Sequence, residues 1–300
     1  MSAQAPSVRR NTPAQAEPPM TNAAHDASVD AKLARMQDLL RTLGRVAVAF
    51  SGGVDSTFVL KVAADVLGTS NVLAVTGRSS SLADVEDADA RRLAALIGVE
   101  HVYLDTQEFN DPNYLANPTN RCYYCKTELY SRMAPLIASR GITAVVNGTN
   151  TDDLGDFRPG LAAGKEHGVH SPAADAGLTK AEIRVLSARM GLPTADKPAA
   201  PCLSSRVQYG ESITREKLKM IEQAEAVLRR LGFGECRVRH HDKLARIEVP
   251  VHRIAELAAD SIRSTLDAEL RALGYQYITL DLRGFRSGSM NEVIAFGKRQ

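Results

Sequence analysis

The 300-residue sequence has no long run of apolar residues, and its charges nearly cancel. A membrane-spanning helix needs about 20 consecutive apolar residues. No run approaches that length, so we expect no spanning helix. The 37 basic and 35 acidic residues give a net charge of +2. Because a nucleic-acid-binding chain carries a basic excess, we expect no nucleic-acid partner. The hydrophobic share of 44% suffices for one large domain or two ordinary ones.

Residues 1–29 lack the apolar stretch of a secretory signal. They are rich in alanine, proline and polar residues, so we expect a disordered leader and a cytoplasmic protein. Cysteine is also scarce, with four residues in the chain. In the cytoplasm, four cysteines favour metal or redox chemistry over structural disulfides.

Two common nucleotide-binding motifs are absent, the P-loop G-x-x-x-x-G-K-[ST] and the dinucleotide motif G-x-G-x-x-G. A different stretch lies between the apolar residues 46–50 and the helical pattern 57–67, namely Ser51, Gly52, Gly53, Val54, Asp55 and Ser56. The glycines allow a tight turn and close approach of the backbone. The N–H groups of the loop and of the helix start then point at one spot. This arrangement predicts a phosphate or pyrophosphate site, although a glycine turn without a ligand is the alternative.

Short apolar strands alternate with helices over the first two thirds of the chain. We expect strands at residues 46–50, 72–75, 101–104 and 144–146, and helices at 31–43, 57–67, 84–97, 129–139 and 179–190. Ser81 and Asp84 are the expected start signal of the third helix. This order predicts the α/β class, with a doubly wound parallel sheet that binds ligands at the carboxyl ends of its strands.

A smaller α+β domain is expected after a cluster of prolines. Its predicted elements are a helix at 214–231, strands at 237–239 and 247–249, a helix at 252–273 and a strand at 277–282. We therefore divide the chain into a leader (1–29), a first domain with the parallel sheet (30–205) and a smaller C-terminal domain (206–300).

Polar segments follow two of the predicted strands. Residues 76–81, with Ser79, end the second strand, and residues 147–153, with Gly148, end the fourth. Asp55, Asp152 and Asp153 are candidate ligands of Mg²⁺, which prefers carboxylate and phosphate oxygens. An ordinary polar loop is the alternative for the second segment.

Cys122 and Cys125 form a C-x-x-C pair, and Cys202 supplies a third thiol. Three cysteines can hold a [4Fe–4S] cluster and leave one iron open. The alternatives are a dithiol redox pair, structural zinc with Cys236 as fourth ligand, or cysteines that only fill the core. The last alternative fits Cys236 best.

Three arginines are candidates for binding anions. Arg206, four residues after Cys202, could stabilise a thiolate or bind a phosphate. Arg283 and Arg286 lie with glycines and serines after the last predicted strand, a composition that suits a phosphate-bearing ligand. An ordinary surface arginine and a flexible terminal loop are the alternatives.

The stretch SGGVDS resembles the signature of the PP-loop ATP pyrophosphatase superfamily, which adenylates substrate oxygens. Together, SGGVDST, NPTNRCYYCK, NGTNTDD, KPAAPCLSSR and DLRGFRSGSMNE resemble the LarE-type ATP-dependent sulfur transferases. The resemblance runs from about residue 30 to the C-terminus. It implies that ATP and Mg²⁺ activate the carboxylates of pyridinium-3,5-biscarboxylic acid mononucleotide for replacement of oxygen by sulfur. The product belongs to the biosynthesis of the nickel-pincer nucleotide cofactor, and hence to lactate racemase maturation.

The resemblance implies that residues 30–205 bind ATP and that residues 206–300 serve substrate binding and oligomerisation. It also implies catalytic roles for Cys202, Arg206 and Asp55. Cys122, Cys125 and Cys202 match members taken to hold a [4Fe–4S] cluster with a labile sulfide, whereas other members sacrifice the sulfur of the cysteine that matches Cys202. The candidates for holding the substrate phosphate are Arg237, Arg283, Arg286 and Glu225. A homo-oligomer is implied, with a hexamer as one form, and a sulfide donor and a nickel-insertion protein are the implied partners.

Three other functions stay open. A superfamily enzyme that thiolates tRNA could carry the same thiols. An amide-forming ligase would need no cysteine trio. An ATP-binding or iron–sulfur sensor would not be an enzyme.

Overall fold

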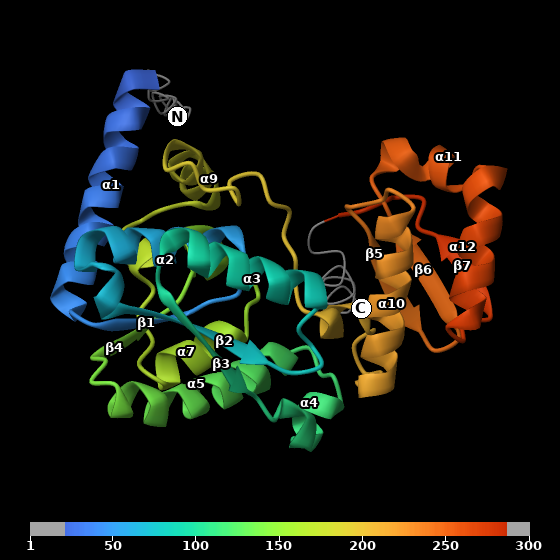
Figure 1. Cartoon of the computed structure of the whole chain (residues 1–300), viewed down its shortest axis with the longest axis horizontal. Helices are drawn as coiled ribbons and strands as arrows, with labels where there is room; N and C mark the ends of the chain where they lie inside the picture. Colours follow the sequence, from blue (N-terminus) through green and yellow to red (C-terminus); the bar gives the residue numbers. More distant parts are fainter. Residues whose placement is uncertain (1–21, 287–300) are drawn as a thin grey trace, which may run out of the picture.

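The computed structural model describes residues 22–286. It contains two sheets, each with its own helices (Figure 1). We predicted a disordered leader over residues 1–29, of which residues 1–21 lie outside the described residues. From Asn22 the chain is helical, so the prediction is wrong for residues 22–29.

The first sheet has four parallel strands in the order β3-β2-β1-β4. Their bounds are β1 (Val46–Ala49), β2 (Val72–Arg78), β3 (Glu100–Asp105) and β4 (Ala144–Val146). Because the order reverses between β1 and β4, the loops that follow these strands diverge at a topological switch point. The predicted α/β class with a parallel sheet is confirmed.

Helices cover both faces of this sheet (Figure 1). Val46 and Val48 pack under α1 (Asn22–Leu43), α2 (Val54–Leu67), α3 (Asp84–Ile97) and α9 (Lys180–Arg189). Ala47 and Val145 pack on the opposite face, against α5 (Arg121–Ser139) and α7 (Gly160–Glu166). This alternation follows from the two-residue period of a strand. Strands that are buried on both faces are apolar throughout, as the sequence indicated.

Three helices begin earlier than we expected. α1 begins at Asn22 rather than at residue 31, α2 at Val54 rather than 57, and α5 at Arg121 rather than 129. The first turns of α1 are held by α9, whose Arg189 pairs with Asp26 and Asp30. Such tertiary contacts extend helices beyond their apolar pattern, which was the signal that we used.

The second sheet orders its strands β5-β6-β7. These are β5 (Arg237–His241), β6 (Leu244–Glu248) and β7 (Tyr277–Leu280), with β5–β6 antiparallel and β6–β7 parallel. α10 (Arg215–Arg230) and α12 (Asp260–Ala272) pack on it. The single helix expected at 252–273 is wrong. A 3-10 turn (Val251–Arg253) and α11 (Ile254–Leu257) precede α12, because Ala259 is extended and breaks the helix.

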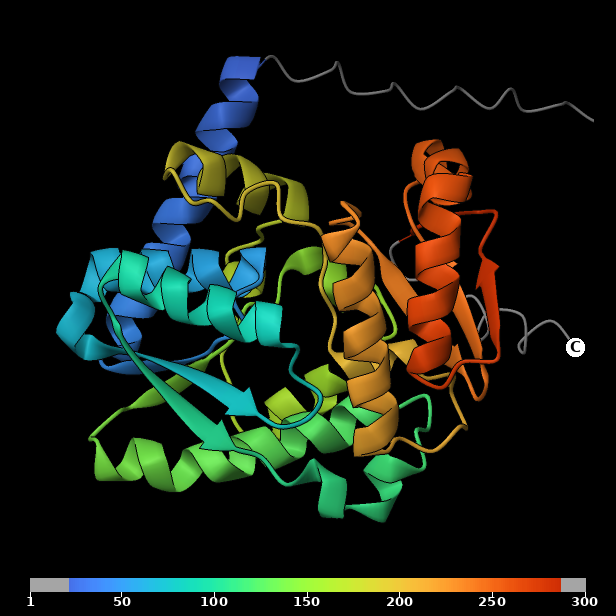
Figure 2. The same cartoon turned by 45° about the vertical axis from the view of Figure 1, so that its right-hand side comes forward.

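α10 joins the two halves of the molecule (Figure 2). Leu218 and Ile221 pack against Phe109 and Tyr114 of the first half. Later residues of the same helix contribute to the core of the second sheet. The domain boundary between residues 205 and 206 stays a prediction.

The connections contain further short elements: η1 (Thr69–Asn71), η2 (Glu108–Asn110), α4 (Pro112–Leu115), α6 (Thr151–Leu154), α8 (Pro172–Asp175) and η3 (Leu203–Arg206). No helix within residues 22–286 combines the length and the apolar character needed to cross a membrane.

Candidate active site

The loop after β1 forms the expected anion cradle. Gly52 has φ +70°, a conformation that favours glycine, and a Cβ there would lie 3.2 Å from the backbone of Ala90 on α3. Gly53 is the N-cap of α2 and has no side chain to satisfy the N–H groups of the first turn. Those groups and the helix dipole therefore face the same spot, which suits a phosphate.

Two serines fix the shape of this loop. The Ser56 hydroxyl donates to the carbonyl of Gly53 at 3.2 Å and accepts from the Ser51 N–H at 3.3 Å. The two hydroxyls lie 3.2 Å apart. These hydrogen bonds order the loop before any ligand binds.

Gly148, in the loop after β4, lies directly against the start of α2. A Cβ at this position would lie 2.7 Å from the amide nitrogen of Ser56, closer than any side chain tolerates. Its backbone therefore forms one wall of the cradle. The structure brings the predicted residues Gly148 and Ser51–Ser56 together at the switch point of the sheet.

The carboxylates predicted to bind Mg²⁺ surround the same loop, and each has a protein partner. Asp55 accepts hydrogen bonds from the Asn150 amide at 3.3 Å and from the Lys180 ammonium. Asp152 accepts from the backbone of Lys180 at 3.0 Å. Asp153 is buried in a capping box with Asn150, and burial raises its pKa. These carboxylates thus lie where a cation would meet the phosphates, and their role as ligands stays a prediction.

Ser79 follows the end of β2, at the same edge of the sheet. Its hydroxyl donates to Glu108 and lies 2.9 Å from the Ser81 hydroxyl. The start of α3 was correctly located at Asp84, but Ser81 does not cap it. Ala83 is the N-cap, and the Asp84 N–H donates to Glu222 of α10 at 2.7 Å.

The three candidate thiols lie on two neighbouring segments. Cys122 and Cys125 are in the first two turns of α5, and Cys202 immediately precedes η3. Arg121 of α5 donates to the carbonyl of Ser204 at 2.9 Å, and the Tyr114 hydroxyl lies 2.7 Å from the Ser204 hydroxyl. These contacts hold the loop of Cys202 against the start of α5.

The surroundings of the Cys125 thiol affect its pKa. Burial raises the pKa of Cys125 to about 12, and Cys202 and Cys122 add to the rise. The positive charge of Lys126 lowers the pKa of Cys125 and so opposes this rise. Burial would lower the pKa of Lys126 itself, but nearby Tyr130 and the three thiols outweigh it and raise that pKa.

Two residues in this region were missed by the sequence reasoning. Arg121 and Lys126 directly flank the C-x-x-C pair, and both are positive charges beside the thiols. Their position directly beside the two cysteines in the sequence is the signal that could have identified them. A cation beside a thiol favours the thiolate, which is the form that binds metal.

The thiols fit an iron–sulfur cluster by donor type, because thiolates are the usual ligands of such clusters. Cys122 and Cys202 are exposed, Cys125 is half-buried, and all three are free. Within residues 22–286, no three cysteine, histidine or acidic side chains already surround the position of a single ion. Cys236 is instead buried in the core of the second sheet, where burial raises its pKa to about 12.

Arg206 lies four residues after Cys202, but its side chain is buried in the protein rather than exposed to solvent. Its guanidinium is buried, pairs with Glu225 at 2.9 Å, and donates to the carbonyls of Pro201 and Cys202. These bonds hold the backbone of the cysteine loop. Arg206 is therefore placed to position Cys202, and the direct catalytic role that we expected stays a prediction.

Arg237 is a buried cation at the junction of the two halves. It donates to the carbonyls of Ala199 at 3.0 Å and Arg286 at 2.9 Å and stacks over Phe285 at 4.2 Å. Burial and the neighbouring Arg239 and Arg206 lower its pKa to about 10. Among the described residues, no carboxylate lies within ion-pair distance of Arg237. A buried guanidinium of this kind is suited to an anionic ligand.

The arginine loop after β7 is only partly described. Gly284 has φ +67°, and a Cβ there would lie 2.8 Å from the carbonyl of Val249. This turn places Arg286 near Asp281 at 3.4 Å and leaves the side chain of Arg283 exposed. The rest of the motif, residues 287–292, lies outside the described residues.

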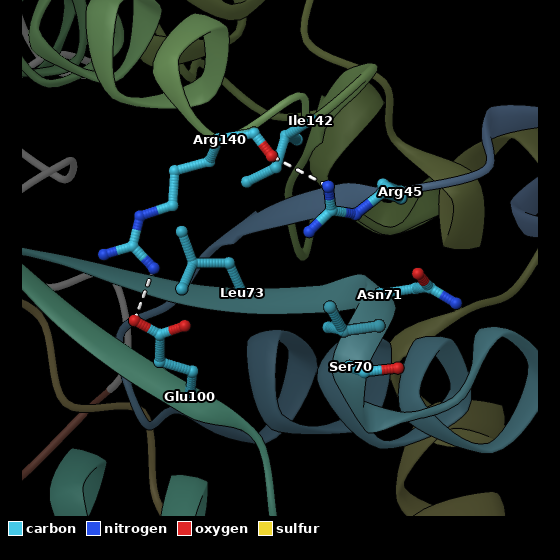
Figure 3. A pocket seen from close by; sticks show the side chains of 8 residues that line it. Arg45, Ser70, Asn71, Leu73, Glu100, Arg140 and Ile142 are labelled. Carbon is cyan, nitrogen blue, oxygen red and sulfur yellow. Dashed lines mark hydrogen bonds and ion pairs between the residues drawn. The ribbon is translucent and has the colours of Figure 1, made fainter.

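A small cavity lies at the opposite, amino-terminal edge of the first sheet (Figure 3). Arg45 donates to the carbonyl of Arg140, and Arg140 pairs with Glu100 across it. Its volume of about 30 Å³ leaves room for little more than a water molecule. None of the predicted site residues lines this cavity.

Comparisons with known proteins agree with this arrangement. Residues 34–114 match the family model of NAD synthase. A protein of uncharacterised function from Synechocystis, slr1717, is 47% identical over 89% of this chain and 99% of its own length. The pyridinium-3,5-bisthiocarboxylic acid mononucleotide synthase of Lactiplantibacillus plantarum is 40% identical over 89% of this chain and 96% of its own length. The tRNA-specific 2-thiouridylase MnmA of Cereibacter sphaeroides is 29% identical over 61% of this chain and 58% of its own.

Proposed function

The chain belongs to the PP-loop proteins and, within them, to the family of pyridinium-3,5-bisthiocarboxylic acid mononucleotide synthases, and from this premise we propose its reaction. It is an ATP-dependent sulfur transferase that converts the two carboxylates of pyridinium-3,5-biscarboxylic acid mononucleotide to thiocarboxylates. The product serves the biosynthesis of the nickel-pincer nucleotide cofactor.

One observation carries this proposal: the segment that bears Cys202 contacts both loops of the predicted ATP site. The Lys197 ammonium donates to the carbonyl of Gly52 in the cradle at 3.3 Å. The N–H of Leu203 donates to the carbonyl of Ser81, after β2, at 2.9 Å. A sulfur source beside an adenylation site is the arrangement that a carboxylate-to-thiocarboxylate conversion needs.

The chemistry proceeds in two displacements. A substrate carboxylate oxygen attacks the α-phosphorus of ATP, so that a C–O–P linkage forms and the bond from phosphorus to the bridging oxygen of the β-phosphate breaks. Pyrophosphate leaves into the cradle. A sulfur nucleophile then attacks the acyl carbon, a C–S bond forms, and AMP leaves with the former carboxylate oxygen.

The chain's own residues supply binding and orientation for these steps. Ser51–Ser56 and Gly148 bind the pyrophosphate portion of ATP, and Ser79 lies beside the nucleoside. Asp55, Asp152 and Asp153 would hold Mg²⁺, which would neutralise the phosphate oxygens. Arg237, Arg283 and Arg286 bind the substrate phosphate. Glu225 acts indirectly, because it neutralises and orients Arg206.

Cys122, Cys125 and Cys202 would hold a [4Fe–4S] cluster, which when bound supplies a labile sulfide at its open iron. Arg121 and Lys126 balance the negative charge of the three thiolates. We further propose a homo-oligomer in the cytoplasm, with a hexamer as one form. It receives sulfide from a donor and passes its product to a nickel-insertion protein for lactate racemase maturation.

The test is anaerobic incubation of the purified protein with ATP, Mg²⁺ and the pyridinium mononucleotide. Mass spectrometry is expected to show exchange of oxygen for sulfur in the product, together with AMP and pyrophosphate. Cys202→Ala should abolish sulfur transfer, whereas Cys236→Ser, which alters a thiol buried in the other core, should retain it.

The same samples separate the alternatives. About four irons per chain, lost in Cys122→Ala, support the cluster. Loss of H₂S from Cys202 during turnover would instead make this cysteine the sulfur source. Thiolation of tRNA in place of the pyridinium compound would contradict the proposed substrate.

A further inference from the structure

The segment between α9 and η3 is held by its backbone from both halves of the molecule. Arg184 of α9 donates to the carbonyls of Ala195 and Lys197. Arg237 of β5 donates to the carbonyl of Ala199, and Arg206 to those of Pro201 and Cys202. We call residues 195–202 the connecting segment. Its path is fixed even though it has no regular secondary structure.

Lys197 is the side chain of this segment that reaches the cradle. Its ammonium lies 2.7 Å from Glu86 and 2.9 Å from Asp89, both on α3, and 3.3 Å from the carbonyl oxygen of Gly52. An ammonium has three donors, and here all three have acceptors. The Lys197 side chain is largely buried, with 16% exposed, so few waters can replace these partners.

The carbonyl that Lys197 holds belongs to the peptide between Gly52 and Gly53. In a trans peptide the N–H points away from the carbonyl. Since the Gly52 oxygen faces Lys197, the Gly53 N–H faces the other way, toward the Ser51 hydroxyl at 3.4 Å, inside the cradle. Glycine backbones rotate readily, so this orientation depends on an external contact.

Lys197 also limits the distance from the cradle to the sulfur site. Cys202 lies five positions after Lys197, which corresponds to at most about 18 Å of extended chain. One side chain thus contacts the phosphate-binding peptide, while its own backbone leads directly to the thiol.

We propose that Lys197 is a positioning residue that fixes the Gly52–Gly53 peptide for pyrophosphate binding and holds Cys202 at its working distance from the adenylate. This inference rests on the proposed function of the cradle. Without the ammonium, the Gly52 carbonyl loses its partner, the carboxylate of Glu86 loses its cation, and Asp89 keeps only its pair with Arg92 on the same helix.

The test compares Lys197→Met with Lys61→Met. Lys61 lies on α2 and pairs only with Asp65 one turn away, so its substitution is a matched control. Calorimetric titration with magnesium pyrophosphate measures the cradle without turnover. We expect binding to weaken about tenfold or more in Lys197→Met, because a hydrogen bond from a charged donor is lost. Lys61→Met should bind like the wild type.

A second readout addresses the placement of Cys202. In turnover, Lys197→Met should form more AMP per thiocarboxylate than the wild type, because the adenylate is hydrolysed before sulfur reaches it. Glu86→Gln, which keeps the lysine and removes one anchor, should show smaller changes in the same direction. It is also the variant to use if Lys197→Met does not fold, as judged by circular dichroism.

Wild-type pyrophosphate affinity together with a wild-type ratio of AMP to thiocarboxylate in a folded Lys197→Met would overturn the inference. If Glu86→Gln is used instead, wild-type pyrophosphate affinity together with a wild-type ratio of AMP to thiocarboxylate would likewise overturn the inference. Failure of the proposed function would look different: the wild type would bind pyrophosphate but form no thiocarboxylate, and the binding comparison would still decide the orientation of the peptide.

Discussion

At the scale of single residues, Gly148 is needed for space rather than for backbone conformation. Unlike Gly52, it has no positive φ angle. Its lack of a side chain lets the loop after β4 contact the backbone of Ser56, with only 2.7 Å available to a Cβ. Glycine at this position therefore determines how closely the two walls of the cradle approach each other.

Gly148→Ala should push the loop away from α2 and reduce ATP-dependent AMP formation about 100-fold, because displacements near 1 Å at a reacting site have such effects. Steady-state kinetics of AMP release would measure the loss. Gly155→Ala is the control, because a Cβ there meets nothing closer than 3.9 Å. Equal activity of both variants would contradict a space requirement at Gly148.

How well a residue's role could be predicted depended on how far along the chain its partners lie. The strand, the glycine turn and the helix start that form the cradle could be predicted because they are consecutive in the sequence. Arg206 was expected to face a ligand, yet it pairs with Glu225, which reaches it only through the packing of α10. The role of Lys197 could not be predicted from its neighbours in the sequence either, because its three acceptors belong to the cradle and to α3.

At the scale of secondary structure, the helix boundaries depend on contacts between elements. The N-cap residue of α3 is Ala83, whose side chain cannot accept a hydrogen bond, and Glu222 of α10 accepts from the Asp84 N–H in its place. The apolar pattern located this helix correctly, but the pattern contains no information about a cap supplied from 138 residues away. The break before α12 and the early start of α5 were missed because neither changes the apolar spacing.

Glu222→Ala should lower the free energy of unfolding by about 1 kcal/mol, the usual cost of a lost helix cap. Urea denaturation followed by circular dichroism would measure it. Gln223→Ala changes an exposed neighbour on the same helix and should have little effect. If both variants unfolded at the same urea concentration, the cap from α10 would contribute nothing.

At the scale of the whole molecule, a buried ion pair joins the cysteine loop to the C-terminal half. Arg206 and Glu225 are both buried, and Glu225 also accepts from the N–H of Val238 in β5 at 3.2 Å. Removing one partner of such a pair leaves an uncompensated charge in the interior. The pair therefore couples the stability of the two halves.

Arg206→Met and Glu225→Met should each lower the free energy of unfolding by about 3–5 kcal/mol. The double variant should lose less than the sum of the two, because no buried charge is left without its partner. Urea titration of the three variants provides the test. Strict additivity would show that the two charges act independently.

The connecting segment is held through its carbonyl oxygens, which every amino acid possesses. The side chains of Pro198, Ala199 and Ala200 are exposed. Arginine side chains donate hydrogen bonds to the backbone carbonyls of this stretch. The path of the backbone therefore does not depend on which amino acids occupy these three positions. Substitutions of these three exposed side chains should therefore change the surroundings of Cys202, while the hydrogen bonds to the backbone keep the cysteine in place.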